Sequence, residues 1–146
     1  MSKEYNPEMH TAEHILNAVM TELKGVRSFS NHIEKKKSKC DYRLGSPLTR
    51  DEITLIEKRV NEVIDSAIPV TYFEMPAGEA MKKFNLPKLP DPAAENLRIV
   101  RIGDFNEYPC IGEHVACTSD IGRFKIASAD LNNGVLRIRF RIELPE

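Results

Sequence analysis

The C-terminal segment constrains the fold most, because it alternates strictly between apolar and charged side chains. Leucine, isoleucine and phenylalanine occupy every second position over 136–142, and three arginines and a glutamate lie between and after them. Successive side chains of a strand point to opposite faces, so the pattern predicts a strand over 135–144 with one buried and one charged face. The Asn-Asn-Gly turn at 132–134 joins it to a strand-like run at 123–129, which predicts an antiparallel hairpin.

Two longer helices are predicted before this hairpin. The first follows Asn6, which can cap it, and ends before Gly25. Its predicted buried face comprises Met9, Ala12, Leu16, Val19, Met20 and Leu23, which recur at helical spacing. The second begins at Thr49, which forms a capping-box pattern with Glu52, and Pro69 stops it. Its predicted buried face comprises Ile53, Ile56, Val60, Val63, Ile64 and Ala67.

Shorter segments complete the expected fold. Strand-like runs occupy 28–34, 39–44, 70–74 and 97–102, and a short helix is predicted over 76–84. Helices and antiparallel hairpins in this order predict an α+β fold, a two-layer sandwich of antiparallel strands with two longer helices and one short helix. The 146 residues match the usual size of one domain, so we expect a single domain over 1–146.

The composition narrows the classes of protein. A net charge of -1 gives no global basic field, so any nucleic-acid contact must come from local basic patches. The N-terminal residues form no apolar signal sequence, and no segment is apolar enough to span a bilayer. Three cysteines are an odd number, which argues against a disulfide framework. These features predict a cytoplasmic protein with no membrane partner and no DNA partner, and they leave the oligomeric state open.

Two short motifs have the spacing of metal ligands. His10 and His14 are four residues apart in a predicted helix, so both imidazoles lie on one face. Cys110 and His114 are separated by three residues that include a glycine, and a tight loop can bring them to one ion. Two nitrogen and sulfur pairs of this kind suit tetrahedral zinc. Together the four residues predict a zinc site.

Each motif alone also has a simpler interpretation. The helical pair can be a half-exposed surface stripe, and the second motif can be a buried thiol beside a surface histidine. The combination favours a metal, since three of the four histidines would otherwise share ligand spacing by accident. Two spare ligand types remain, His32 and Cys117, and Cys117 can compete with Cys110. Cys40 alternates with apolar residues and is expected in the core.

The motifs resemble those of a known family. The segment 10–16, His-Thr-Ala-Glu-His-Ile-Leu, resembles the HxxxH segment of the editing domain of alanyl-tRNA synthetase. The segments 110–115 and 118–126, with Thr118 and the Ile-Gly pair at 121–122, resemble the second motif of that family. The resemblance covers nearly the whole chain and is closest to the free-standing editing proteins. A similar domain occurs in threonyl-tRNA synthetase.

The resemblance implies a zinc-dependent deacylase that removes serine or glycine from mischarged alanine tRNA. A synthetase pocket rejects slightly smaller or hydroxylated amino acids too weakly by binding alone, so a second hydrolytic site improves fidelity. Ile111 and Glu113 depart from the small residues usual in the synthetase domain, which affects pocket shape and substrate choice. A hydroxyl that lies near zinc in the free-standing relatives corresponds to Ser28 or Ser30, which can hydrogen-bond the serine of the substrate; a local hydrogen bond is the alternative.

The catalytic group stays open at this point. Four protein ligands close a tetrahedral zinc, which is typical of a structural site, whereas catalysis needs a fifth position or a ligand that loosens. Glu13 and Glu113 are weak candidates for a base. For Glu13, we favour a solvated carboxylate or one that orients an imidazole.

Several basic residues are candidates for RNA contact. Lys35, Lys36 and Lys37 with Lys39 form the densest run, which can equally be a solvated turn. Arg137, Arg139 and Arg141 share one face of the last strand and form a patch. Further candidates are Lys82, Lys83 and Lys88.

Three other functions compete with the editing hydrolase. The H-x-x-E-H pattern at 10–14 also fits inverzincin peptidases and is similar to the zinc motif of S-ribosylhomocysteine lyase, but the second motif speaks against both. A non-catalytic tRNA-binding module with a structural zinc is the second alternative. An α+β domain without metal is the third.

Overall fold

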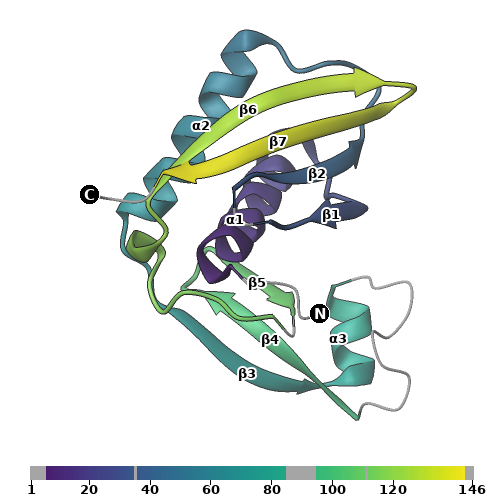
Figure 1. Ribbon diagram of the computed structural model, residues 1–146. Coiled ribbons are helices and arrows are strands. Elements are labelled where there is room, and N and C mark those ends of the chain that lie inside the picture. The colour runs from purple at the N-terminus through teal and green to yellow at the C-terminus, as the bar shows by residue number, and fades with distance from the viewer. Residues whose placement is uncertain (1–5, 35, 85–94, 111, 144–146) are drawn as a thin grey trace.

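The computed structural model describes residues 6–34, 36–84, 95–110 and 112–143 (Figure 1). In chain order the elements are α1 (Pro7–Lys24), β1 (Ser30–His32), β2 (Ser38–Arg43), α2 (Arg50–Asp65), β3 (Val70–Pro76), α3 (Ala77–Lys83), β4 (Asn96–Ile102), β5 (Asn106–Pro109), the 3-10 helix η1 (Thr118–Asp120), β6 (Arg123–Asn132) and β7 (Val135–Glu143). No helix in these described ranges combines the length and the apolar character that crossing a bilayer requires.

Local sequence signals determine the ends of the long helices. The Asn6 side chain accepts a hydrogen bond of 2.8 Å from the Met9 backbone N–H at the start of α1. Gly25 ends α1 in the left-handed conformation, at φ 68°. Thr49 and Glu52 form the predicted reciprocal capping box of α2. Both helix starts and the end of α1 therefore agree with the sequence prediction.

The predicted buried faces hold except at their C-terminal ends. Leu23 is 38% exposed, because the last turn of α1 extends beyond the sheet-covered core. Ala67 is also exposed and lies outside α2, which ends at Asp65, four residues before Pro69. Ala67 has φ 50°, so the chain turns away from the helix axis before the proline is reached. Including Leu23 and Ala67 in the core was therefore wrong.

The strands form two antiparallel sheets. The larger has the order β1-β2-β7-β6 and the smaller the order β3-β4-β5. Figure 1 shows α1 and α2 on one side of the larger sheet and α3 beside the smaller one. The main core joins the layers, since it contains residues of α1 and α2, Leu136 and Ile138 of β7, and Val100 and Ile102 of β4. This arrangement is the predicted α+β class.

The predicted hairpin is present, with a two-residue turn. Asn132 pairs with Val135, and the turn residues Asn133 and Gly134 have φ values of 52° and 77°. Two positive φ angles match the twist of an antiparallel hairpin and explain the Asn-Gly pair. Along β7, Leu136, Ile138 and Phe140 are fully buried, as the alternation predicted.

Two strands differ from the sequence prediction. β1 is limited to Ser30–His32 and is exposed along its length. β5 was missed, because its four residues show no alternation that distinguishes a strand from a loop. β5 pairs with β4 and leads directly into Cys110, so it contributes to the position of the second motif.

Candidate metal centre

The four predicted ligands come together between the two layers. The ligand atoms of His10, His14, Cys110 and His114 all lie within 4.8 Å of one another. Cys110 Sγ lies 3.3 Å from His10 Nε2. Two ligands belong to α1 and two to the loop after β5, about one hundred residues further along the chain. The site is therefore formed by tertiary packing.

Thr11 orients the imidazole of His114. The Thr11 hydroxyl donates to the Pro7 carbonyl at 2.8 Å, accepts from the Val115 N–H at 3.1 Å, and lies 3.0 Å from His114 Nδ1. A hydroxyl has one proton and two lone pairs, so with its proton on Pro7 it must accept from His114. Nδ1 of His114 thus carries the hydrogen, and the lone pair of Nε2 is available to a metal.

The loop that carries Cys110 and His114 is fixed to the smaller sheet. Arg98 Nε on β4 donates to the Cys110 carbonyl at 2.9 Å, and the same guanidinium also donates to the Gly112 carbonyl. The His114 N–H donates to the Tyr72 hydroxyl at 3.1 Å, and the Arg98 guanidinium stacks 4.4 Å from the Tyr72 ring centroid. These contacts fix the loop before any ion binds.

Burial keeps the three imidazoles neutral. It lowers the pKa of His10 to about 4, with the nearby positive charge of Arg98 adding to the effect. It also lowers the pKa of His114 to about 3, with the charges of His10 and Arg98 adding, and it lowers the pKa of His14 well below its usual value. Neutral imidazole is the form that binds metal.

Burial shifts the pKa of the Cys110 thiol upward, opposite to its effect on the imidazoles. Burial is the main cause that raises the pKa of this thiol above its usual value, and a backbone hydrogen bond from Gly112 partly opposes it. A metal that binds here must therefore displace a proton, which couples metal affinity to pH.

The donor set fits a metal ion. His14 Nδ1 and His114 Nε2 are buried and have no hydrogen-bond partner among the residues described. Such orphaned polar atoms are rare in folded proteins and indicate a missing partner. Three neutral imidazoles and one thiolate are ligands that zinc accepts in tetrahedral geometry. The cluster can therefore hold a metal ion, with zinc favoured by its chemistry.

Glu13 is buried, at 5% exposure, so the expectation of a solvated carboxylate was wrong. Its Oε1 lies 3.9 Å from His10 Nε2, and its Oε2 accepts a hydrogen bond of 2.9 Å from Asn17. Burial is the main cause that raises its pKa. The packing of α1 against the sheet encloses this carboxylate, whose hydrogen bonds come from Asn17 and Asn31, whereas its distance from His10 exceeds that of a hydrogen bond.

Asn17 connects Glu13 to the segment after α1. Its Oδ1 accepts a hydrogen bond of 2.9 Å from the Ser28 N–H. The Ser28 Oγ is buried and has no partner among the described residues, whereas Ser30 lies exposed in β1. Of the two predicted substrate-binding serines, Ser28 is therefore the one connected to the ligand-bearing helix. The bridging role of Asn17 depends on the fold, because it joins α1 to a residue eleven positions further along the chain.

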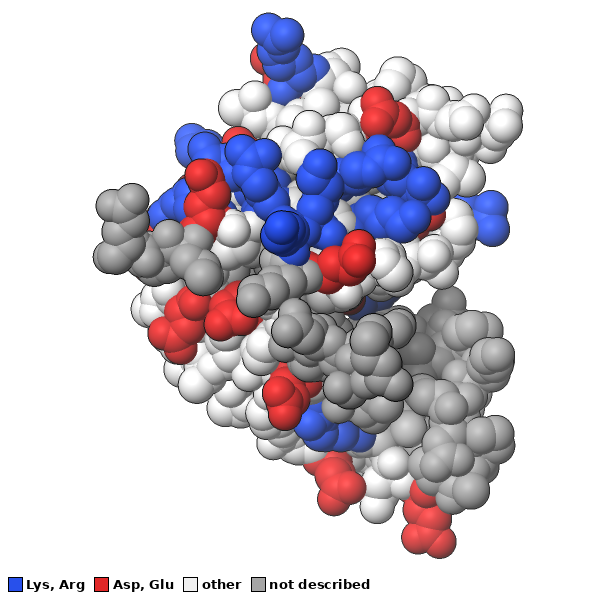
Figure 2. Space-filling model, viewed as in Figure 1, with Lys and Arg blue, Asp and Glu red and all other residues white. Residues whose placement is uncertain are grey.

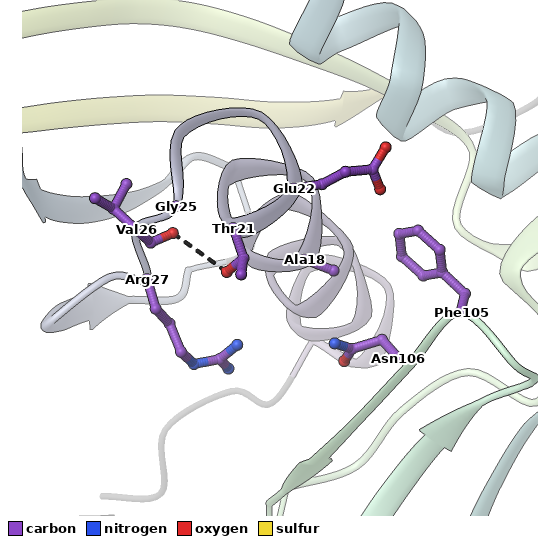
Figure 3. A pocket seen from close by; sticks show the side chains of 8 residues that line it. All are labelled: Ala18, Thr21, Glu22, Gly25, Val26, Arg27, Phe105 and Asn106. Atoms are coloured by element: carbon purple, nitrogen blue, oxygen red, sulfur yellow. Dashed lines mark hydrogen bonds between the residues drawn. The ribbon is translucent and has the colours of Figure 1, made fainter. Parts of the chain in front are cut away.

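A pocket lies along the C-terminal half of α1, and none of the eight residues that line it is a predicted metal ligand (Figure 3). It has a volume of about 400 Å³ and lies between the second half of α1, the segment after it, and the turn before β5. Ala18 on its wall is one helical turn beyond His14. The Arg27 guanidinium lies 3.4 Å from the Tyr108 ring centroid, and that ring meets the His14 ring edge-on at 6.3 Å.

The charges and polar atoms of this pocket are mostly uncommitted. Arg27 forms no ion pair or side-chain hydrogen bond with a described residue, and the buried Asn106 Oδ1 likewise has no partner there. Glu22 at the opposite wall is paired with Arg59 at 3.2 Å. The pocket wall thus carries a guanidinium that stacks on Tyr108 and a buried amide oxygen without a partner among the described residues.

The remaining predicted residues lie elsewhere. Glu113 is exposed, while its backbone forms a hydrogen bond with the His10 ring. Cys117 contacts Ser119 at 3.2 Å and is not part of the ligand cluster, and His32 is exposed and lies 3.3 Å from Glu34. Cys40 is fully buried, as expected. Two of the basic candidates, Lys35 and Lys88, lie outside the described residues, and Lys36, Lys37, Lys82 and Lys83 are exposed.

Comparison with known proteins agrees with the fold and the motifs. Residues 97–139, which include Cys110 and His114, match the family described as "Threonyl and Alanyl tRNA synthetase second additional domain". Alanine–tRNA ligase of Fervidobacterium nodosum is 39% identical over 132 residues, and that of Petrotoga mobilis 34% over 132 residues. Each alignment covers 88% of this chain. The chain spans about 15% of the length of these curated relatives.

The fold and the site define an α+β domain with a possible metal centre of three histidines and one cysteine between its layers. The chain belongs to the family of the threonyl- and alanyl-tRNA synthetase second additional domain. This agrees with the family predicted from the two motifs.

Proposed function

We propose that this chain is a zinc-dependent hydrolase that acts in trans on mischarged tRNA, removing serine or glycine from tRNA of the alanine type. The observation that carries the proposal is the ligand cluster of His10, His14, Cys110 and His114, with atoms within 4.8 Å of one another. The kinship with alanine–tRNA ligases supports the choice of substrate.

The reaction is the hydrolysis of an ester. The oxygen of water adds to the carbonyl carbon, the bond from that carbon to the ribose oxygen breaks, and the ribose oxygen takes a proton as the amino acid leaves. When bound, zinc supplies Lewis-acid polarisation to the ester or to the attacking water. The chain holds the ligands in place through the Thr11 hydroxyl at His114 and the Glu113 backbone at His10.

The pocket beside Tyr108 suits the RNA end of the substrate. Arg27 can pair with a phosphate of the 3′ end, and Asn106 Oδ1 can accept a hydrogen bond from a base or a ribose hydroxyl. Only Ala18 of this pocket lies one helical turn from His14, so we propose that the nucleotide occupies the pocket while the terminal ester extends along α1 toward the ligand cluster. Arg27→Lys should therefore raise KM more than it lowers kcat, since lysine retains the charge but not the planar fork.

Ser28 is our candidate for recognising the serine side chain. Its hydroxyl is buried and without a partner among the described residues, and its backbone is tied to the ligand-bearing helix through Asn17. A hydroxyl recognised by a buried hydrogen-bonding group distinguishes serine from glycine. Ser28→Ala should lower the rate on seryl-tRNA relative to glycyl-tRNA, with exposed Ser30→Ala as the control. An unchanged ratio would remove Ser28 from this role.

The test of the proposed function measures release of serine from seryl-tRNA of the alanine type. Correctly charged alanyl-tRNA and a zinc chelator are the controls. We expect fast release of serine, slow release of alanine, and loss of activity on chelation that added zinc restores. Absence of release by protein with stoichiometric zinc would reject the proposal.

The four-ligand site supports a second candidate, a non-catalytic tRNA-binding module with a structural zinc. Four protein ligands fill the tetrahedral positions of zinc and leave none for water. This candidate predicts tRNA binding without turnover and a large loss of thermal stability on chelation.

A further inference from the structure

The outer face of the larger sheet carries a group of basic side chains. Alternation and register place five of them on the face opposite the core, and we call this set the basic face: Lys39, Lys125, Arg137, Arg139 and Arg141. Figure 2 shows lysine and arginine gathered over β2, β7 and β6. With a net charge of -1 over the chain, this face departs from the overall balance of charge.

The strand register places like charges directly opposite each other. Lys39 of β2 pairs with Arg139 of β7, and Lys125 of β6 pairs with Arg141 of β7. Like charges at paired positions of neighbouring strands destabilise a sheet. Two such pairs lie two residues apart on β7, so the fold retains a local repulsion that a bound polyanion would relieve.

Internal carboxylates neutralise only part of the basic face. Arg137 forms a two-point pair with Asp41, at 2.7 and 3.0 Å. Arg139 lies 3.5 Å from Asp130, whose side chain is 70% exposed. Lys39, Lys125 and Arg141 form no ion pair or side-chain hydrogen bond with a described residue. Three cations are therefore available to an external ligand.

The same face has a hollow with an aromatic wall. Phe29 is 47% exposed, and the Arg43 guanidinium lies 4.3 Å from its ring centroid. The other polar groups that line the hollow are Arg137, Arg139, their carboxylate partners Asp41 and Asp130, and the amides of Asn132 and Asn133. The hollow has a volume of about 520 Å³, which is in the range of small-molecule sites. An exposed ring beside arginines can stack on an unpaired base while the arginines contact phosphate.

We propose that the basic face binds the sugar-phosphate backbone of RNA and that the Phe29 hollow receives an unpaired nucleotide of it. Identification of that RNA as tRNA rests on the proposed function. Regularly spaced cations match a polyphosphate chain, and fixed polar groups in a hollow suit a nucleotide. An anionic lipid surface would use the charge but has no need of the hollow.

The test measures binding of uncharged alanine tRNA to the full chain as a function of salt. The variant is Lys39→Ala/Arg141→Ala, which removes one cation from each like-charge pair. The control is Arg50→Ala/Lys58→Ala, an equal change of charge at exposed positions of α2. Thermal stability is measured for both, and phosphatidylserine vesicles serve as the second probe.

We expect the basic-face variant to weaken tRNA binding by about tenfold or more and to lower the salt slope by about 1.4 to 1.8, since each of the two lost phosphate contacts contributes about 0.7–0.9. Its thermal stability should be unchanged or raised, because repulsion is relieved. The control variant should bind as the wild type does. Equal weakening in both variants, an unchanged salt slope, or a preference for vesicles over tRNA would overturn the inference.

This experiment separates the inference from the proposed function, because it needs no turnover. Hydrolysis of a small aminoacyl-nucleotide ester reports on the metal centre alone and should be equal in wild type and variant. If no ester is hydrolysed while the variant still weakens salt-dependent tRNA binding, the proposed function fails and the basic face stands. If the ester is hydrolysed but the variant binds tRNA as the wild type does, the inference about the basic face fails and the proposed function stands.

Discussion

The Thr11 hydroxyl lies 3.0 Å from His114 Nδ1, although the two residues are 103 positions apart in the chain. Its proton is committed to the Pro7 carbonyl, so it accepts the hydrogen of the imidazole and determines the tautomer. Thr11 therefore presents the lone pair of His114 Nε2 to the ligand cluster.

Replacing Thr11 should weaken metal binding without removing a ligand. Thr11→Val keeps the shape but leaves the His114 N–H and the Val115 N–H without an acceptor, and we expect a 10–100-fold loss of zinc affinity. Thr11→Ser retains the hydroxyl and should stay near the wild-type value. Competition with a chromogenic chelator measures both. Equal affinities for the two variants would show that Thr11 only fills space.

The ligand assignment predicts the metal content of four single variants. His14→Ala and Cys110→Ser should each abolish stoichiometric zinc, because three ligands of a buried site cannot compensate for the fourth. The matched controls are His32→Ala and Cys117→Ser, which change the same residue types outside the cluster. Elemental analysis of purified protein gives the answer. If a control variant loses zinc while its matched ligand variant retains it, the metal site lies elsewhere in the chain.

The pair between Asp41 and Arg137 should make stability depend on pH. The hydrogen bond from Arg137 is the main cause that lowers the pKa of Asp41. Its stabilisation is therefore present above the unfolded pKa of about 3.9 and is lost as pH falls through the lower folded pKa. Asp41→Asn should lower the melting temperature at pH 7, and its difference from wild type should shrink below about pH 4.

The control for this pair is Asp104→Asn. Asp104 also meets an arginine, Arg101, but its side chain is 99% exposed, so its removal should change stability little at any pH. Melting curves of all three proteins between pH 2.5 and 7 provide the comparison. A difference for Asp41→Asn that does not vary with pH would contradict the electrostatic account.

Gly122, in the Ile-Gly pair of the second motif, occupies a position where the neighbouring backbone leaves no room for a Cβ atom. It has φ 102°, and a Cβ there would lie 2.5 Å from the Glu143 carbonyl oxygen. Gly122→Ala should destabilise the chain by on the order of 1–3 kcal/mol. Gly78→Ala in α3 meets no atom within 4 Å and should be neutral or stabilising, by up to about 1 kcal/mol. Urea denaturation measures both, and similar effects would argue against this steric explanation.

The sequence predicted the elements that depend on local signals. The caps of α1 and α2 and the Asn-Gly turn act within a few residues, so their positions could be derived without a fold. The ligand quartet was accessible because each pair keeps a local spacing. Contacts between distant segments were not accessible: Thr11 with His114, Arg98 with the ligand loop, and Arg27 over Tyr108 each depend on how the layers meet.

The burial of Glu13 shows the same limit. The sequence analysis favoured a solvated carboxylate or one that orients an imidazole, and the packing of α1 against the larger sheet rules out the solvated alternative. Leu23 shows the opposite error: it was predicted to be buried but is exposed, because the helical pattern continues one turn beyond the sheet that covers α1. β5 was missed because its pairing with β4, and not its own residues, makes it a strand.

The position of the ligand cluster between α1 and the loop after β5 has a consequence for folding. An ion bound there would act as a cross-link between segments that are 100 positions apart. Closing a loop of that length limits the unfolded chain by about 4–5 kcal/mol in the relation used for disulfides. An ion held by His10 and Cys110 would therefore stabilise the whole domain as a cross-link. Its removal would first weaken the packing of the smaller sheet against α1.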